Sequence, residues 1–131
     1  MTPTSRTVVD SWAWIEYFDG SERGRAVEAK LKESKEIWTS AVSLAEIVSR
    51  YRRRHLDESR PLEVLLSLSR VGTPTSDDSR EAGKIHAEVK SRSRNFGLGD
   101  AFVLQLARKL DATVLTGDPD FRGLKGAEVI E

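Results

Sequence analysis

Asp100-Ala-Phe-Val-Leu-Gln-Leu-Ala-Arg-Lys-Leu110 is followed, after one residue, by Ala112-Thr-Val-Leu-Thr-Gly-Asp118. The first stretch has apolar residues at helical spacing from Phe102 to Leu110, which predicts a helix over 101–110 with one buried face. The second stretch begins with four residues that are typical of a short buried strand. A helix that leads directly into a buried strand is typical of an α/β protein with a parallel sheet.

Short apolar strands alternate with helices along the rest of the chain. This alternation predicts a three-layer α/β/α sandwich, in which a central parallel sheet is covered by helices on both faces. At 131 residues, with no linker and no internal repeat, the chain is expected to form a single domain over residues 1–131. We expect strands at 7–9, 36–39, 112–115 and 128–130, a short strand within 70–74, and helices at 12–18, 24–34, 43–55, 61–70, 77–92 and 101–110.

The composition excludes several classes of protein. There is no cysteine, so disulfides and thiolate metal sites are excluded, and a reducing compartment is indicated. The 21 Lys and Arg residues balance the 21 Asp and Glu residues, so contact with nucleic acid must come from a local patch. The polar start, Met1 to Arg6, has no secretory pattern, and the apolar runs are too short to span a bilayer. We therefore expect a cytoplasmic protein without membrane association.

Four acidic residues occur where a predicted strand ends or a predicted helix begins. They are Asp10, Glu46, Asp100 and Asp118. In parallel α/β sheets the ligand site lies outside the carboxyl ends of the strands, so these acids are expected to converge there. Carboxylates held close together resist ionisation unless a cation lies among them. Oxygen ligands without His or Cys favour Mg²⁺ or Mn²⁺ over Zn²⁺.

Each of these acids also has an ordinary structural interpretation. Asp10 and Asp100 could each be the N-cap of the following helix. Ser43 and Glu46 match the capping box, in which Glu reaches back to the N-cap amide. Asp118 stands before a proline in a predicted turn, and Asp120, two residues further on, is a rival for the fourth acid.

Four segments of the chain carry a resemblance to a known family. They are Val8-Val-Asp10-Ser11, Ser40-Ala-Val-Ser-Leu-Ala-Glu46-Ile47, Leu98-Gly-Asp100-Ala-Phe-Val-Leu-Gln-Leu-Ala107 and Leu115-Thr-Gly-Asp118-Pro-Asp-Phe121. In this order and spacing the chain resembles the PIN-domain family, and within it the VapC-like toxins of toxin–antitoxin pairs. The resemblance covers nearly the whole chain, and its specificity lies in the ordered set of four segments.

The resemblance implies Mg²⁺- or Mn²⁺-dependent RNA cleavage, a homodimer and a cognate antitoxin. It also implies that Ser11 and Thr116 support the acids by hydrogen bonding. Some relatives carry Asn at the place of Asp118 and use an acid further along the turn, so the choice between Asp118 and Asp120 stays open.

The resulting hypothesis is an endoribonuclease in which a metal-activated water attacks the phosphodiester and leaves a 5′-phosphate and a 3′-hydroxyl. Asp10, Asp100 and Asp118 are the predicted metal ligands, and Glu46 would orient a water or a second ion. The alternatives are an RNA-processing nuclease outside a toxin–antitoxin pair, and a non-catalytic PIN-fold scaffold that binds RNA or protein. A receiver domain and a haloacid-type phosphatase are disfavoured, because neither residue 11 nor residue 12 is a second acid.

Two groups of basic residues are candidates for RNA contacts. Arg92 and Arg94, which lie shortly before Asp100, are the predicted phosphate contacts. The denser basic run from Arg50 to His55 has two interpretations: a solvated helix end stabilised by the helix dipole, or a second RNA contact.

Overall fold

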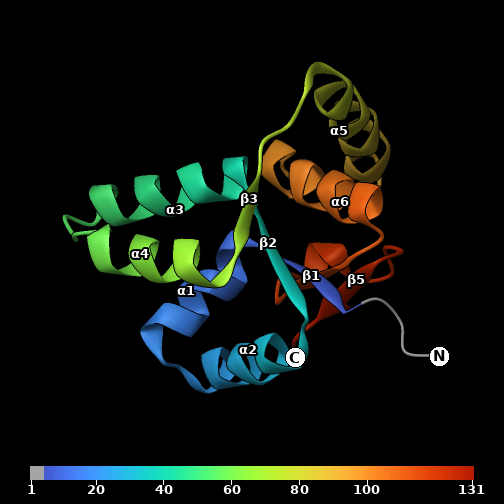
Figure 1. The fold of residues 1–131 in the computed structure, drawn as a ribbon. Helices are drawn as coiled ribbons and strands as arrows, with labels where there is room; N and C mark the ends of the chain where they lie inside the picture. The colour runs from blue at the N-terminus through green and yellow to red at the C-terminus, as the bar shows by residue number, and fades with distance from the viewer. Residues whose placement is uncertain (1–4) are drawn as a thin grey trace.

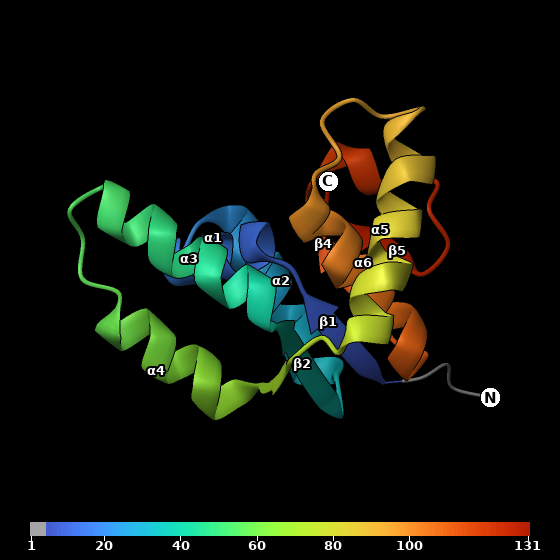
Figure 2. The same cartoon turned by 90° about the horizontal axis from the view of Figure 1, so that it is seen from above.

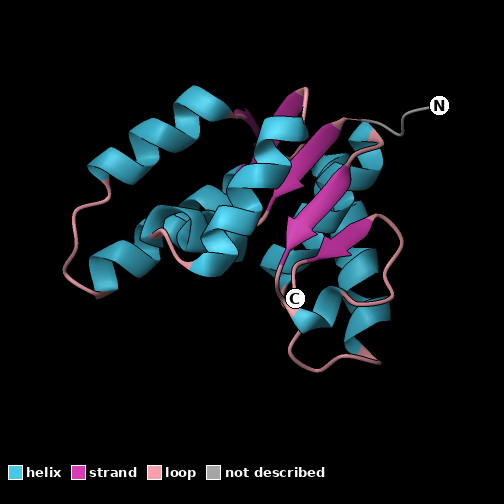
Figure 3. Cartoon of the chain, turned by 90° about the horizontal axis from the view of Figure 1, so that it is seen from below, coloured by secondary structure: helices cyan, strands magenta, loops and turns pink. Residues whose placement is uncertain are grey.

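The computed structural model describes residues 5–131, which form a five-stranded parallel sheet covered by helices (Figures 1 and 3). The first four residues of the predicted domain, with most of the polar start, lie outside this part of the chain. The strands lie in the order β3-β2-β1-β4-β5. Their bounds are β1 (Arg6–Val9), β2 (Glu36–Ser40), β3 (Arg70–Gly72), β4 (Thr113–Thr116) and β5 (Ala127–Val129).

The order of the strands creates a crevice at the centre of the sheet. From β1 the chain runs outward to β2 and then β3, whereas β4 lies on the other side of β1 and leads outward to β5. The connections that leave β1 and β4 therefore diverge at the carboxyl ends of these neighbouring strands. This is the position at which open α/β sheets bind ligands.

The described residues form six α-helices and one 3₁₀-helix. None of these helices is long and apolar enough to cross a membrane. Their bounds are α1 (Ser11–Asp19), α2 (Glu22–Glu33), α3 (Ala41–Arg53), α4 (Ser59–Leu68), α5 (Ser76–Lys90), α6 (Leu98–Leu110) and η1 (Pro119–Phe121).

The helices form separate layers on the two faces of the sheet, as predicted. Figures 1 and 2 show α5 and α6 on one side and α1 to α4 on the other. Because side chains alternate along a strand, Val8 and Val114 pack with α5 and α6, whereas Val9 and Leu115 pack with the α1 side. All four of these side chains are buried, so the two central strands have a core on each face.

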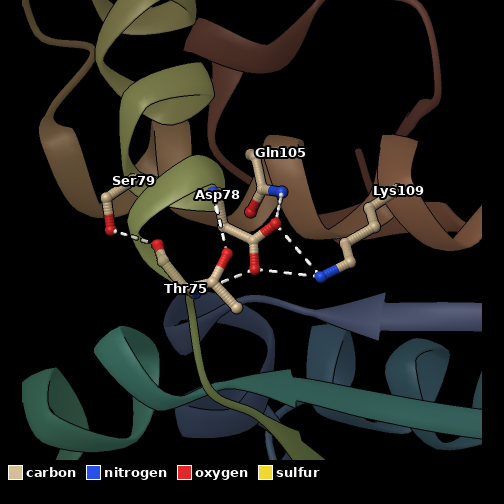
Figure 4. Close-up of polar contacts among 5 residues, drawn as sticks. All are labelled: Thr75, Asp78, Ser79, Gln105 and Lys109. Carbon is tan, nitrogen blue, oxygen red and sulfur yellow. Dashed lines mark hydrogen bonds and ion pairs between the residues drawn. The ribbon is translucent and has the colours of Figure 1, made fainter.

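A partly buried polar network joins α5 to α6 (Figure 4). Asp78 accepts hydrogen bonds from the Thr75 amide (2.9 Å), Gln105 Nε2 (3.0 Å) and Lys109 Nζ (3.0 and 3.1 Å). The Thr75 amide and the Lys109 ammonium lower the pKa of Asp78 to about 2. This network fixes the position of α6, the helix that carries Asp100.

The N-terminus of α3 differs from the predicted one. The helix begins at Ala41, because the Ser40 hydroxyl caps it by accepting a hydrogen bond from the Val42 amide (3.2 Å). Ser43 is therefore inside the helix, and the predicted Ser43–Glu46 capping box is wrong. Glu46 lies in the second turn, where its side chain is free to serve another purpose.

Candidate active site at the carboxyl edge of the sheet

The predicted acids lie around the crevice between β1 and β4. Asp10 directly follows β1, and its amide donates a hydrogen bond to the carbonyl of Leu115 in β4 (3.3 Å). Asp118 follows β4 after Gly117, Asp100 lies in the first turn of α6, and Glu46 projects from α3. Four segments that are distant in sequence thus bring acids to one edge of the sheet.

Asp10 is the most deeply buried member of the set, with 4% of its surface exposed. Its Oδ1 accepts a hydrogen bond from the Ala13 amide (2.8 Å), so the N-cap interpretation is confirmed. Burial raises the pKa of Asp10 to about 7, and the charges of Asp100 and Asp118 add to the effect, although hydrogen bonds from Thr116 and Ala13 oppose it. The residue therefore both caps α1 and belongs to the carboxylate cluster.

Asp100 is half-buried at the third position of α6. The prediction that it is the N-cap is wrong: the helix begins at Leu98, and the N-cap is Gly97. Instead, Asp100 Oδ2 accepts a hydrogen bond from the Gly97 amide (2.8 Å). Burial raises the pKa of Asp100 to about 6, despite this hydrogen bond, and the nearby charges of Asp118, Glu46 and Asp120 contribute.

Asp118 caps the short helix η1 in the predicted turn. Its Oδ1 accepts a hydrogen bond from the Asp120 amide (2.9 Å), and its own amide donates to Thr116 Oγ1 (3.0 Å). Burial raises the pKa of Asp118, and Asp120 adds to the rise. Asp118 in turn raises the pKa of both Asp10 and Asp100, which places it among them.

Asp120, in the same turn, is bound by another segment of the chain. Its Oδ1 accepts a hydrogen bond from the Ser93 hydroxyl (2.7 Å), in the connection between α5 and α6. Arg92 and Arg94 flank this serine and are exposed, and Arg92 lies 4.0 Å from the carboxylate of Glu88. The two predicted RNA contacts therefore lie beside the turn of the fourth acid.

Glu46 is the exposed member of the set, and its side chain contacts residues next to two of the other acids. Its Oε1 accepts a hydrogen bond from the Ser11 hydroxyl (3.3 Å), next to Asp10. Partial desolvation raises its pKa. Its carboxylate also lies against Gly99, the residue before Asp100, so that a β-carbon at this position would overlap with it.

Two glycines are required by this arrangement, and their roles were not foreseen from the sequence. Gly99 accommodates Glu46, and Gly117 lies so close to the indole ring of Trp12 that a β-carbon would overlap with it. Each glycine directly precedes an acid of the set, Asp100 or Asp118. This repeated Gly-Asp pair is the sequence signal that could have identified both glycines.

The donor chemistry of the set fits a hard divalent cation. The side chains offer carboxylate oxygens. Burial, with a smaller contribution from neighbouring charges, raises the pKa of Asp10 and Asp100, and a bound cation would favour their ionised forms. Within residues 5–131, however, no three His, Cys, Asp or Glu side chains stand in an arrangement that could hold an ion as they are. To bind one ion together, the carboxylate side chains would therefore have to rotate toward one another.

A groove of about 660 Å³ opens beside these acids, between α1 and α3. Ser11 and Glu46 lie in its lining at the site, and Arg50 and Arg53 lie further along α3. Trp12 forms part of the α1 wall. Two arginines of the basic run at the end of α3 therefore share the lining of this groove with Glu46.

Comparison with known proteins agrees with the predicted fold. The PIN domain family model matches residues 7–127. A toxin–antitoxin complex from Klebsiella pneumoniae is similar, with a TM-score of 0.74 and 21% identity over 94% of this chain and 96% of that chain. VapC20 from Mycobacterium tuberculosis, a sarcin-ricin loop cleaving toxin, has a TM-score of 0.73 and 22% identity, covering 95% and 99%. Comparison with curated proteins finds no match.

A third solved structure is similar at lower identity. VapBC2 from Rickettsia felis, bound to a DNA fragment from its promoter, has a TM-score of 0.70 and 16% identity, covering 95% of this chain and 97% of that chain. At such identities these three likenesses show the fold, and they confirm the predicted α/β/α sandwich.

Proposed function

Since the chain belongs to the PIN-domain family, we propose that it is an endoribonuclease that depends on Mg²⁺ or Mn²⁺ and acts as the toxin of a toxin–antitoxin pair. One observation carries the proposal: Asp10, Asp100 and Asp118 come from three separate segments and meet at the crevice between β1 and β4, where the charge of Asp118 contributes to the raised pKa of both Asp10 and Asp100. Structural roles alone do not require these three carboxyl groups to be close together.

In the proposed site, Asp10, Asp100 and Asp118 would hold the cation. A bound divalent ion lowers the pKa of a water molecule and supplies a nucleophile near neutral pH. Thr116 keeps the Asp10 carboxyl group in place, and Ser11 does the same for Glu46. Glu46, exposed at the mouth of the groove, would orient the attacking water. Attack by water would leave a 5′-phosphate and a 3′-hydroxyl.

The proposed partners follow from the relatives. Complexes of VapC-type toxins with their antitoxins are among the similar structures, which supports an antitoxin partner for this chain. A homodimer is proposed from the family, and the exposed Leu66 and Leu68 of α4 offer apolar surface for such a contact. We also propose that the protein acts in the cytoplasm, where its RNA substrates would be.

A cleavage assay on single-stranded RNA tests the proposed activity. The purified protein should cleave with Mg²⁺ or Mn²⁺, lose activity in EDTA and regain it when excess Mn²⁺ is added. The Asp100→Asn variant should be inactive under all of these conditions. Full activity of the wild type in chelator, or of the variant with metal, would contradict the proposal.

The toxin role needs a separate test. Induced expression of the wild type should arrest bacterial growth, and co-expression of the short reading frame next to its gene should restore it. Cleavage in vitro without growth arrest would favour an RNA-processing nuclease outside a toxin–antitoxin pair.

A further inference from the structure

The groove between α1 and α3 is continuous with the proposed active site. Ser11 and Glu46, joined by the hydrogen bond of 3.3 Å, belong both to the acid cluster and to the lining of the groove. From this point α3 extends away from the sheet (Figures 1 and 2). A ligand that leaves the acids on this side would therefore run along α3.

The face of α3 that lines the groove carries two arginines in line with Glu46. Residues three, four and seven positions apart lie on one face of a helix, and Arg50 and Arg53 follow Glu46 at four and seven positions. With a rise of 1.5 Å per residue, they lie about 6 and about 10 Å further along the helix axis. Both side chains are exposed.

The charges of these two arginines are available to a ligand. Among residues 5–131, no carboxylate lies within ion-pair distance of either guanidinium group. Arg53 Nε donates only to the carbonyl and the hydroxyl of Ser49 (both 3.3 Å). In contrast, Arg52 lies outside the groove lining and forms an ion pair with Glu58 (3.1 Å).

The opposite wall contributes shape and one further acid. Glu16 of α1 lines the groove, and its Oε1 accepts a hydrogen bond from the Ser21 hydroxyl (2.8 Å). The Trp12 ring already contacts Gly117 and lies 5.8 Å from the guanidinium carbon of Arg23. Trp12 is therefore a wall of the groove and not a free platform for a base.

We propose that this groove carries the RNA strand on one side of the cleaved bond, with Arg50 and Arg53 binding successive phosphates. The inference rests on the proposed function, because it takes RNA as the substrate. A chain with no net charge does not attract RNA by its overall field, so the strand must find local cations as it leaves the acids. Arginine suits this role because its planar guanidinium matches phosphate oxygens. Such contacts position the strand without reading its sequence.

Binding of a fluorescent single-stranded oligoribonucleotide to Asp100→Asn protein, which does not cleave it, tests the inference. The titration is repeated at several salt concentrations, with and without Arg50→Gln/Arg53→Gln. Loss of two phosphate contacts should reduce the slope of log affinity against log salt by about 1.4, since each contact on a single strand contributes roughly 0.7. Arg52→Gln is the matched control: it removes a charge from the same helix end and should leave the slope unchanged.

An unchanged slope in the double variant, with the fold intact by circular dichroism, would overturn the inference and leave the groove to a protein segment such as an antitoxin tail. An equal reduction of the slope in Arg52→Gln would also overturn the inference, because the change would then reflect the overall positive charge of the helix end and not contacts in the groove. With all four acids present, the double variant should show a raised KM and a retained kcat. The expected salt slopes in a protein that shows no metal-dependent cleavage would uphold this inference and refute the proposed function.

Discussion

The carboxylate of Glu46 on α3 lies against Gly99, the second residue of α6, and occupies the space that a β-carbon would need. The next residue is Asp100, whose pKa is raised in part by the charge of Glu46. Glycine at position 99 therefore allows an acid from one helix to approach an acid from another. The position of Glu46 beside Asp100 thus depends on the absence of a side chain at position 99.

Gly99→Ala should reduce cleavage while the protein stays folded. The new methyl group would overlap with the end of a flexible side chain, so Glu46 would move and the helix would remain. Displacement of a catalytic group by about 1 Å can reduce the rate by roughly 100-fold. The assay is kcat on single-stranded RNA, together with a thermal melt.

Gly83→Ala in α5 is the control for this prediction. A β-carbon at position 83 has no atom within 4 Å, so the variant should keep full activity. It should also be more stable, since alanine in a helix is favoured over glycine by about 1 kcal/mol. Equal activity in the two variants would show that Glu46 need not occupy its place beside Gly99.

Asp118→Asn should abolish cleavage, whereas Asp120→Asn should keep most of it. Asp118 raises the pKa of both Asp10 and Asp100. Asp120 also raises the pKa of Asp100, but its carboxylate accepts a hydrogen bond from the hydroxyl of Ser93 in another segment. Both variants should bind RNA as the wild type does, which separates catalysis from binding. The opposite order of activities would assign the fourth acid to Asp120.

The metal-free protein should lose stability as the pH rises from about 5 to 7.5. Burial raises the pKa of Asp10 to about 7 and that of Asp100 to about 6, both above the ordinary value of 3.8. The folded state therefore holds these protons more tightly than the unfolded state, and the stability they contribute is lost as the pH rises through this window. Thermal melts in EDTA at the two pH values measure the effect.

Asp10→Asn supplies the comparison for the pH dependence. Asparagine keeps an N-cap acceptor for the Ala13 amide but has no proton to release. Its melting temperature should fall less between pH 5 and 7.5 than that of the wild type. A wild type whose melting temperature falls no more than that of the variant over this interval would show that burial of the Asp10 carboxylate does not destabilise the metal-free protein.

Asp100→Asn should make the metal-free protein at least as stable as the wild type at pH 7.5. The change removes one of the mutually repelling carboxylates and keeps an oxygen that can accept the Gly97 amide. The variant should lose most of the stabilisation that Mg²⁺ gives to the wild type, which follows RT ln(1 + [L]/Kd). Identical responses of the two proteins to Mg²⁺ in thermal melts would exclude Asp100 as a ligand.

The strands, and the edge of the sheet at which the acids lie, could be predicted because each depends on a short local sequence pattern. Val8 and Val9 before Asp10, and Val114 and Leu115 before Asp118, mark buried strands followed directly or closely by an acid. In a parallel sheet, strand ends meet at one edge, so the convergence of these two acids follows from the pattern.

The start of α6 and the neighbours of Glu46 could not be predicted in the same way. Glycines at 97 and 99 indicate a loop by propensity, yet the structure uses Gly97 as the N-cap and continues the helix through Gly99. Tertiary contact decides here, because Gly99 must be small to accommodate a side chain from another helix. The contact between Trp12 and Gly117 likewise joins residues that no local pattern connects.

The location of three of the four acids outside the strands has an evolutionary consequence. Asp100, Asp118 and Glu46 lie on helix turns and a loop, outside the strand pairing and the two cores. Single substitutions there can abolish cleavage while the protein stays folded. Replacement of Asp10 by a residue that cannot cap, such as alanine, also removes a helix cap and costs about 1 kcal/mol of stability. A lineage relieved of selection for cleavage would thus be expected to lose the outer acids first and to persist as a folded, inactive descendant.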